Sequence, residues 1–167
     1  MTVGPLTLTP RYNQTTKGGP MLQQSMAIEY AMAPAARLSR NEASALAGWI
    51  DESYRPLAGL VDTSQGEVTP EGLMSCWRRS GRLLISAAHS EHPVLTPEQN
   101  VRFRAVHDHH HLLTAAGFGW AGEKAAYDLA CATAPEMIHW VLRSEILLQA
   151  AYKLETGLFA KQKLVRS

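Results

Sequence analysis

The chain has 167 residues, of which 46% are hydrophobic and 19% are charged, and its formal net charge at pH 7 is +1. This length and apolar fraction fit a single domain with its own core. The near-neutral charge argues against nucleic-acid binding. The sequence has no run of about 20 apolar residues, which argues against a membrane span. Because the N-terminus also lacks a secretory pattern, we expect a cytoplasmic protein.

The N-terminal part of the sequence predicts an arm followed by short helices. Residues 1–20 are rich in Thr, Gly, Pro and Asn without helical periodicity, which predicts an extended arm that could join copies of the chain into a homo-oligomer. The remaining residues, 21–167, are predicted to form one helical domain. Within it, residues 21–32 predict a short helix, and the capping box that begins at Ser39 starts a second one.

The segment between residues 61 and 88 carries weaker signals. Residues 61–68 (VDTSQGEV) predict a loop. Thr69 followed by a proline predicts the N-cap of a helix, which Gly81 ends. Residues 82–88 (RLLISAA) fit either a strand or a helix, and we favour the helix slightly.

Three helices are predicted in the C-terminal half. Thr96, followed directly by proline and three positions later by glutamine, is the strongest start signal in the chain and predicts a helix over residues 97–115. Further helices are predicted over residues 122–134 and 136–156. Together these patterns predict an all-α fold, a helical bundle of about five to six helices with an extended N-terminal arm.

Four of the seven histidines lie within five residues of the helix predicted over residues 97–115. His107 and His111 are four positions apart, which places both imidazoles on one helix face with their Cβ atoms about 5 to 6 Å apart. Two imidazoles at this spacing suit one metal ion. Asp108 and His110 point elsewhere and could support the ligands. The alternative is a solvated histidine-rich face, or an accidental tag-like run, that binds nothing.

A carboxylate on the last predicted helix adds to this pattern. Apolar residues recur at helical spacing along one face, and Glu145 lies on that face with Gln149 one turn later. An unpaired buried charge costs on the order of several kcal/mol, so such a carboxylate must be protonated, paired or bound to a metal. Metal ligation or acid–base catalysis is one interpretation. The others are a different helix phase, or a buried ion pair with Arg78, Arg102 or Arg104.

Glu123 lies at the start of the helix predicted over residues 122–134. Its ordinary role would be that of a first-turn acid favoured by the helix dipole. The tight turn before it nevertheless brings it near the end of the histidine helix, where it can reach the imidazoles. His89 and His92 are weaker ligand candidates. We therefore predict one divalent ion (Zn, Mn or Fe) held from three helices by His107, His111, Glu123 and Glu145.

A series of short motifs runs through residues 89–152: HPVL from His92, FRAVHD ending at Asp108, a histidine at His111, the pair Gly122-Glu123, and Glu145 with Gln149. This series resembles an uncharacterised bacteriophage domain that recurs in polyvalent proteins of phages and conjugative elements. The resemblance implies a phage origin, hence a location in the cytoplasm of an infected bacterial host or in the virion. It also implies the same four polar positions, with His110 as the alternative to His111 for the second histidine.

The His107-Asp108 doublet followed by His111 is also similar, more weakly, to the HD phosphohydrolases, an all-helical metal-dependent superfamily. That similarity implies a further upstream histidine, which His89 or His92 would supply. It also implies a distant downstream aspartate, for which Asp128 lies close in sequence.

The predicted function follows from the metal site. We expect a metal-dependent hydrolase in which a metal-activated water attacks a small-molecule substrate and Asp108 or Glu145 acts as general base. A non-haem iron oxidoreductase is the second enzymatic option. The alternative is a non-catalytic phage structural or interaction protein, which binds another phage protein and whose polar cluster is a buried hydrogen-bond network.

Overall fold

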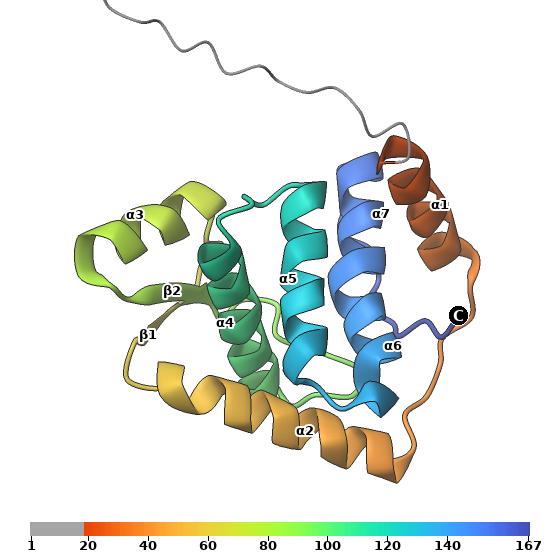
Figure 1. The fold of residues 1–167 in the computed structure, drawn as a ribbon, viewed down its shortest axis with the longest axis horizontal. Coiled ribbons are helices and arrows are strands. Elements are labelled where there is room, and N and C mark those ends of the chain that lie inside the picture. The colour runs from red at the N-terminus through yellow and green to blue at the C-terminus, as the bar shows by residue number, and fades with distance from the viewer. Residues whose placement is uncertain (1–18) are drawn as a thin grey trace, which may run out of the picture.

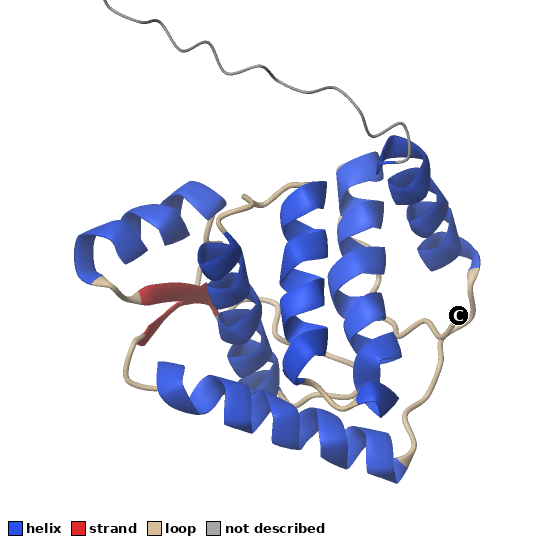
Figure 2. Ribbon diagram, viewed as in Figure 1, coloured by secondary structure: helices blue, strands red, loops and turns tan. Residues whose placement is uncertain are grey.

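Helices make up most of the structure, a computed structural model that describes residues 19–167 (Figure 2). Three helices, α4 (Pro97–Thr114), α5 (Trp120–Thr133) and α7 (Gln149–Thr156), stand side by side (Figure 1). A fourth, α2 (Arg40–Tyr54), crosses beneath them and contacts α4, and α1 (Gly19–Met32) packs along α7. The predicted all-α helical bundle is confirmed.

The predicted N-terminal arm falls almost entirely outside the described residues. Only Gly19 and Pro20 of residues 1–20 are described, and these two residues open α1. The predicted capping box at the start of α2 is present, because Ser39 Oγ accepts the Glu42 amide while the Glu42 carboxylate accepts the Ser39 amide. Within residues 19–167, none of the helices combines the length and hydrophobicity that a membrane span requires.

Two short strands correct the expectations for residues 61–88. The predicted loop begins with the strand β1 (Val61–Ser64), and the segment for which helix was favoured holds β2 (Leu83–Ser86), which pairs with β1 in parallel. The helix α3 (Pro70–Ser80) connects them. Gly81 ends α3 in the left-handed conformation (φ +64°), so the helix cannot continue into residues 82–88.

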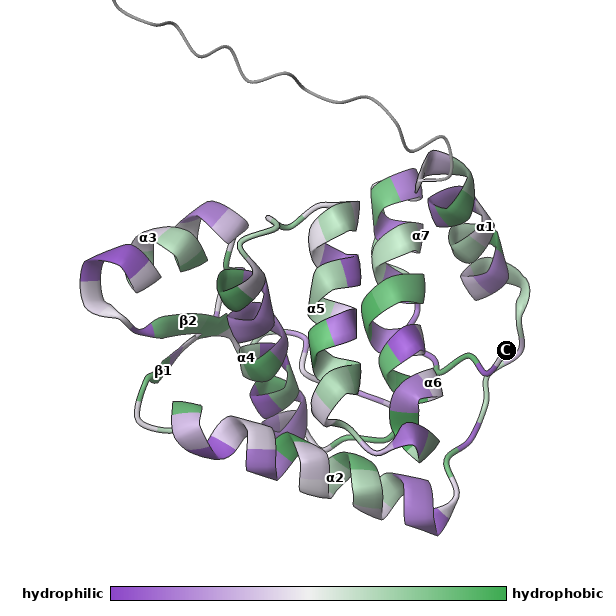
Figure 3. Ribbon diagram, in the orientation of Figure 1, coloured by the Kyte–Doolittle hydropathy of each residue, from purple (hydrophilic) through white to green (hydrophobic). Residues whose placement is uncertain are grey.

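Burial explains why β2 is a strand. Leu83 and Ile85 are buried while Leu84 and Ser86 are half-buried, which is the two-residue alternation of a strand with one face on the core. Figure 3 shows β2 as a hydrophobic segment beside α4. The Arg82 guanidinium donates to both carboxylate oxygens of Asp62 at 2.6 and 2.7 Å, which fixes the ends of the two strands together.

The predicted helix over residues 136–156 is interrupted. A 3₁₀ turn (Glu136–Ile138) and the short helix α6 (His139–Leu142) lead into the π-helical segment η3 (Arg143–Leu148), and α7 follows until Gly157 caps it with φ +72°. A π turn contains more residues than an α turn, so it rotates the later side chains away from the face that an unbroken 3.6-residue period predicts. This segment contains Glu145.

The core that supports the histidine helix is continuous. Fully buried apolar side chains from α2, β2, α4 and α6 belong to one cluster, among them Ile50, Leu83, Val106 and Leu142. On α5 the buried positions are small, Gly122, Ala126 and Ala130, and they recur every four residues. Such a stripe lets α5 approach α4 and the last helix closely.

Candidate metal centre

The turn between α4 and α5 brings Glu123 to the predicted histidine face. Ala115, at φ +51°, ends α4, and Gly117, at φ +79°, reverses the chain. The next helix starts at Trp120, so Glu123 lies in its first turn. Gly122 packs against the turn so tightly that a Cβ there would lie 1.9 Å from the Gly117 carbonyl oxygen.

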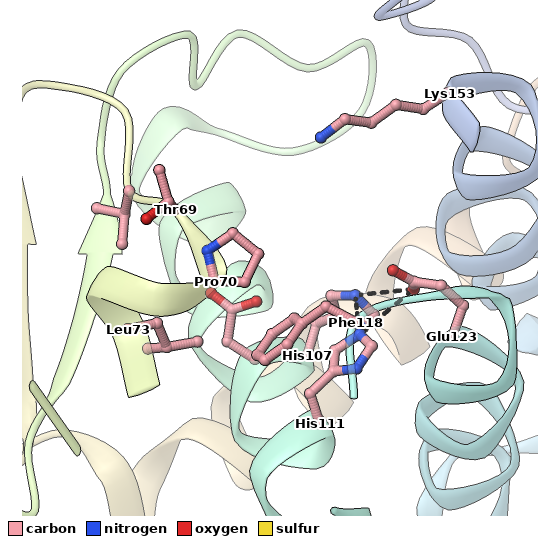
Figure 4. A pocket seen from close by; sticks show the side chains of 10 residues that line it. Thr69, Pro70, Leu73, His107, His111, Phe118, Glu123 and Lys153 are labelled. Carbon is pink, nitrogen blue, oxygen red and sulfur yellow. Dashed lines mark hydrogen bonds and ion pairs between the residues drawn. The ribbon is translucent and has the colours of Figure 1, made fainter. Parts of the chain in front are cut away.

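Three side chains converge at this point (Figure 4). The Nε2 atoms of His107 and His111 are 3.2 Å apart. Glu123 Oε2 lies 3.3 Å from the His107 Nε2 and 3.4 Å from the His111 Nε2. The three side chains are 20%, 0% and 15% exposed, so water competes little for them. Of the sequence-predicted ligands, the structure brings together His107, His111 and Glu123.

The edges of the triangle can be compared with the ligand separations of common metal geometries. Zinc bonds of about 2.0–2.1 Å at tetrahedral angles separate neighbouring ligand atoms by about 3.3–3.4 Å. An octahedral ion with similar bonds would need about 3.0 Å between adjacent ligands. The observed edges of 3.2 to 3.4 Å fit one face of a tetrahedron with a fourth position left for solvent or substrate.

The hydrogen bonds of His111 set the tautomer that a metal ligand needs. Its Nδ1 lies 2.7 Å from the carbonyl oxygen of Gly117. A carbonyl oxygen can only accept, so Nδ1 carries a proton and Nε2 is the ring nitrogen left to bind a metal ion. Phe118 stacks on the ring with centroids 4.6 Å apart and holds its orientation. A ring nitrogen fixed by a backbone carbonyl is the usual outer support of a metal-bound histidine.

The electrostatics of the centre couple the Glu123 carboxylate to the two imidazoles. Burial alone would raise the pKa of Glu123, but the hydrogen bonds and charges of His107 and His111 lower it to about 2. Burial likewise favours neutral His107, yet the hydrogen bond and charge of Glu123, with the charge of Asp108, raise its pKa above 6.5. Glu123 is therefore a carboxylate, and its negative charge stabilises the protonated form of His107.

The centre opens into a cavity of about 210 Å³. Asp108 lines this cavity, is half-buried, and has a pKa raised by burial against the lowering charges of His107 and His111. Thr69 and Lys153 also line it. Neither residue was predicted to belong to the site, because Thr69 caps α3 and Lys153 lies on α7, and their distance from α4 depends on the tertiary fold.

Glu145 is not a member of this group, contrary to the prediction of a fourth ligand. It is buried as predicted, with 6% of its side chain exposed, but its Oε2 lies 3.2 Å from Nε2 of the fully buried His92. The backbone amides of Val94 and Leu95 donate to His92 Nδ1 at 3.2 and 3.1 Å. Nδ1 is thus the acceptor and Nε2 carries the proton, which leaves His92 no lone pair for a metal. Nε2 lies near the carboxylate but makes no hydrogen bond of its own among the described residues.

Gln149, which was predicted to support Glu145, also lies away from the metal centre. Gln149 accepts a hydrogen bond from Gln162 Nε2 at 3.4 Å, which places it with the C-terminal segment rather than with the histidines. The arginine pairing considered for Glu145 is absent from the described residues. Arg102 bonds Asp51 and Glu98, Arg104 bonds the backbone carbonyls of Ser86 and Ala88 at and after the end of β2, and Arg78 forms no ion pair with Glu145. The HPVL turn orients the His92 ring through its two amides, but nothing local in the sequence indicates that the ring meets Glu145.

The other histidine candidates lie apart from the centre. His110 is buried, and burial together with the charges of neighbouring histidines lowers its pKa to about 4. The structure places His111, not His110, beside His107 and Glu123. The structure does not bring the further ligands implied by the similarity to HD phosphohydrolases to the centre. Among residues 19–167, the metal-ligand group includes neither His89 nor His92, and Asp128 is exposed on α5.

The fold and centre together define a helical bundle with a two-histidine, one-carboxylate group at the mouth of a small cavity. No known family model, curated protein or solved structure matches the chain. The similarity to the phage domain therefore stays a prediction, and function has to be argued from the centre itself.

Proposed function

We propose that the chain binds one divalent metal ion, zinc by preference, through His107 Nε2, His111 Nε2 and the Glu123 carboxylate. The observation that carries the proposal is the triangle of liganding atoms with edges of 3.2, 3.3 and 3.4 Å. Two imidazoles favour zinc or iron over magnesium or calcium. The edge lengths favour tetrahedral over octahedral coordination, and so zinc over iron.

We propose further that the centre performs hydrolysis. With three protein ligands and an open position, a bound ion would lower the pKa of a coordinated water toward neutrality. Asp108 lines the same cavity and, with its raised pKa, is suited to accept that water's proton and pass it to the leaving group. In the proposed reaction the water oxygen would bond to the electrophilic atom of the substrate while the bond to the leaving group breaks, and the leaving group would take the proton from Asp108.

Metal titration of the untagged chain tests the proposal. We expect one equivalent of zinc per chain, and a loss of affinity of at least about 100-fold in His107→Ala and Glu123→Gln. His109→Ala is the matched control, because His109 lies on the same helix between the two ligands but packs on Trp77. If the wild-type chain takes up no zinc, or if both ligand variants bind zinc as the wild type does, the result would instead support the non-catalytic protein with a buried hydrogen-bond network.

The pH dependence of zinc binding gives a separate prediction. Zinc must displace the proton of His107, whose pKa is raised above 6.5, so affinity should rise with pH. The rise should be about tenfold per pH unit as long as one proton is released per ion. We expect it to continue above pH 6.5, where an ordinary histidine would already be neutral. Calorimetric titrations in several buffers measure it, and an affinity that levels off at or below pH 6.5 would contradict the assigned charge state.

A further inference from the structure

Lys153 supplies positive charge to the cavity beside the metal centre. It is the one cationic side chain among the residues that line the cavity, apart from the histidines. Figure 4 shows it extending from α7 across the cavity toward the start of α3. Its Nζ lies 4.1 Å from the centroid of the Phe159 ring, a contact that holds the ammonium without using an oxygen acceptor.

The three N–H donors of this ammonium remain free within the part of the chain that the structure describes. Among residues 19–167, no carboxylate forms an ion pair with Lys153 and no oxygen accepts a hydrogen bond from its Nζ. By contrast, Lys163 donates to the backbone carbonyl of Ala33 at 2.6 Å. Lys153 is exposed to solvent, and it places a positive charge without a carboxylate partner over the space above Glu123.

A neutral donor faces the same space from the other wall. Thr69, the N-cap of α3, lines the cavity, and its Oγ1 accepts the Gly72 amide at 3.1 Å. Acceptance uses a lone pair and leaves the hydroxyl hydrogen available to donate. The start of an α-helix carries the positive end of its dipole, which adds to the preference for a negative group here.

The net charge of the centre with a metal ion bound also favours a negatively charged ligand. Two neutral imidazoles and one carboxylate leave a divalent ion with net positive charge, and Lys153 adds another. Asp108 is the one further acid that lines the cavity, so the occupied cavity is cationic. No arginine lines the cavity, so it lacks the planar guanidinium that binds a carboxylate through two hydrogen bonds. Its cationic side chain is the Lys153 ammonium, a compact charge of the kind that binds phosphoryl oxygens.

We infer that the substrate carries a compact oxyanion, a phosphoryl group or a carboxylate, held between the metal centre, Lys153 Nζ and the Thr69 hydroxyl. This inference rests on the proposed metal function and names the substrate class for the same site. A cavity of about 210 Å³ has room for the anionic group of a substrate.

Anion binding to the zinc-loaded full chain tests the inference. Inorganic phosphate and acetate are titrated separately into wild type, Lys153→Met and the control Lys161→Met, an exposed lysine outside the cavity. We expect saturable binding of one anion, weakened at least about tenfold in Lys153→Met and unchanged in the control. Tighter binding of phosphate would assign a phosphoryl substrate, and tighter binding of acetate a carboxylate.

Zinc content, measured on each variant beforehand, separates the two ways to fail. Lys153→Met should bind zinc as the wild type does, because Lys153 is not in the ligand group. Normal zinc uptake with no anion binding, or with equal anion binding in wild type and Lys153→Met, overturns this inference alone. Failure of the wild-type chain to take up zinc overturns the proposed function and this inference with it.

Discussion

Alanine at position 122 is expected to destabilise the fold and abolish tight metal binding together. A Cβ on Gly122 would lie 1.9 Å from the carbonyl oxygen of Gly117, 2.6 Å from its carbon and 3.2 Å from His111 Nδ1. The neighbour is backbone that cannot rotate away, so the turn must shift and the hydrogen bond that orients His111 must break. We expect a loss of about 3 kcal/mol in the free energy of unfolding and about 100-fold in zinc affinity.

Gly119→Ala is the matched control in the same turn. Gly119 has φ −92°, which any residue adopts, and a Cβ there would meet nothing within 4 Å. Urea denaturation and zinc titration of both variants measure the two effects. A Gly122→Ala protein with wild-type stability and zinc affinity would show that the turn does not set the geometry of the centre.

Removal of the Glu145 carboxylate should damage the fold and spare the metal centre. In Glu145→Ala, the fully buried imidazole of His92 loses the carboxylate whose Oε2 lies 3.2 Å from its Nε2. Breaking one side of a buried pair costs about 3–5 kcal/mol, because the remaining polar group is left without a partner. Zinc affinity, measured at a temperature where the variant is folded, should change by less than about twofold, since Glu145 is not in the ligand group.

Glu155→Ala serves as the comparison, because Glu155 is an exposed carboxylate on α7 and its removal should change stability by about 0.5 kcal/mol or less. A folded Glu145→Ala protein that loses zinc about 100-fold would contradict the separation of the His92–Glu145 pair from the metal centre.

Local signals in the sequence predicted the helices well. Ser39 and Thr96 begin their helices with the capping boxes expected of them, and Gly81 and Gly157 end theirs in the left-handed conformation. These signals depend on backbone groups within a few residues, so no knowledge of the tertiary fold is needed. The two strands were missed because each is four residues long and is stabilised mainly by its pairing partner and by burial of one face.

The centre was predictable to the extent that it depends on short-range geometry. The spacing of His107 and His111 and the short turn before Glu123 sufficed to bring three groups together. Glu145 was correctly predicted to be buried, but helix phase shows only that a side chain faces the interior, not what it meets there. The π-helical segment and the loop carrying His92 decide its partner, and both depend on how the whole bundle packs.

Zinc-soaked crystals of the untagged chain, with an anomalous difference map at the zinc edge, test the central claim most directly. We expect one strong peak at about 2.0–2.2 Å from His107 Nε2, His111 Nε2 and a Glu123 carboxylate oxygen, with a solvent ligand toward the cavity. If the map shows no peak at that position at saturating zinc, or shows a peak between His92 and Glu145 instead, the assignment is contradicted.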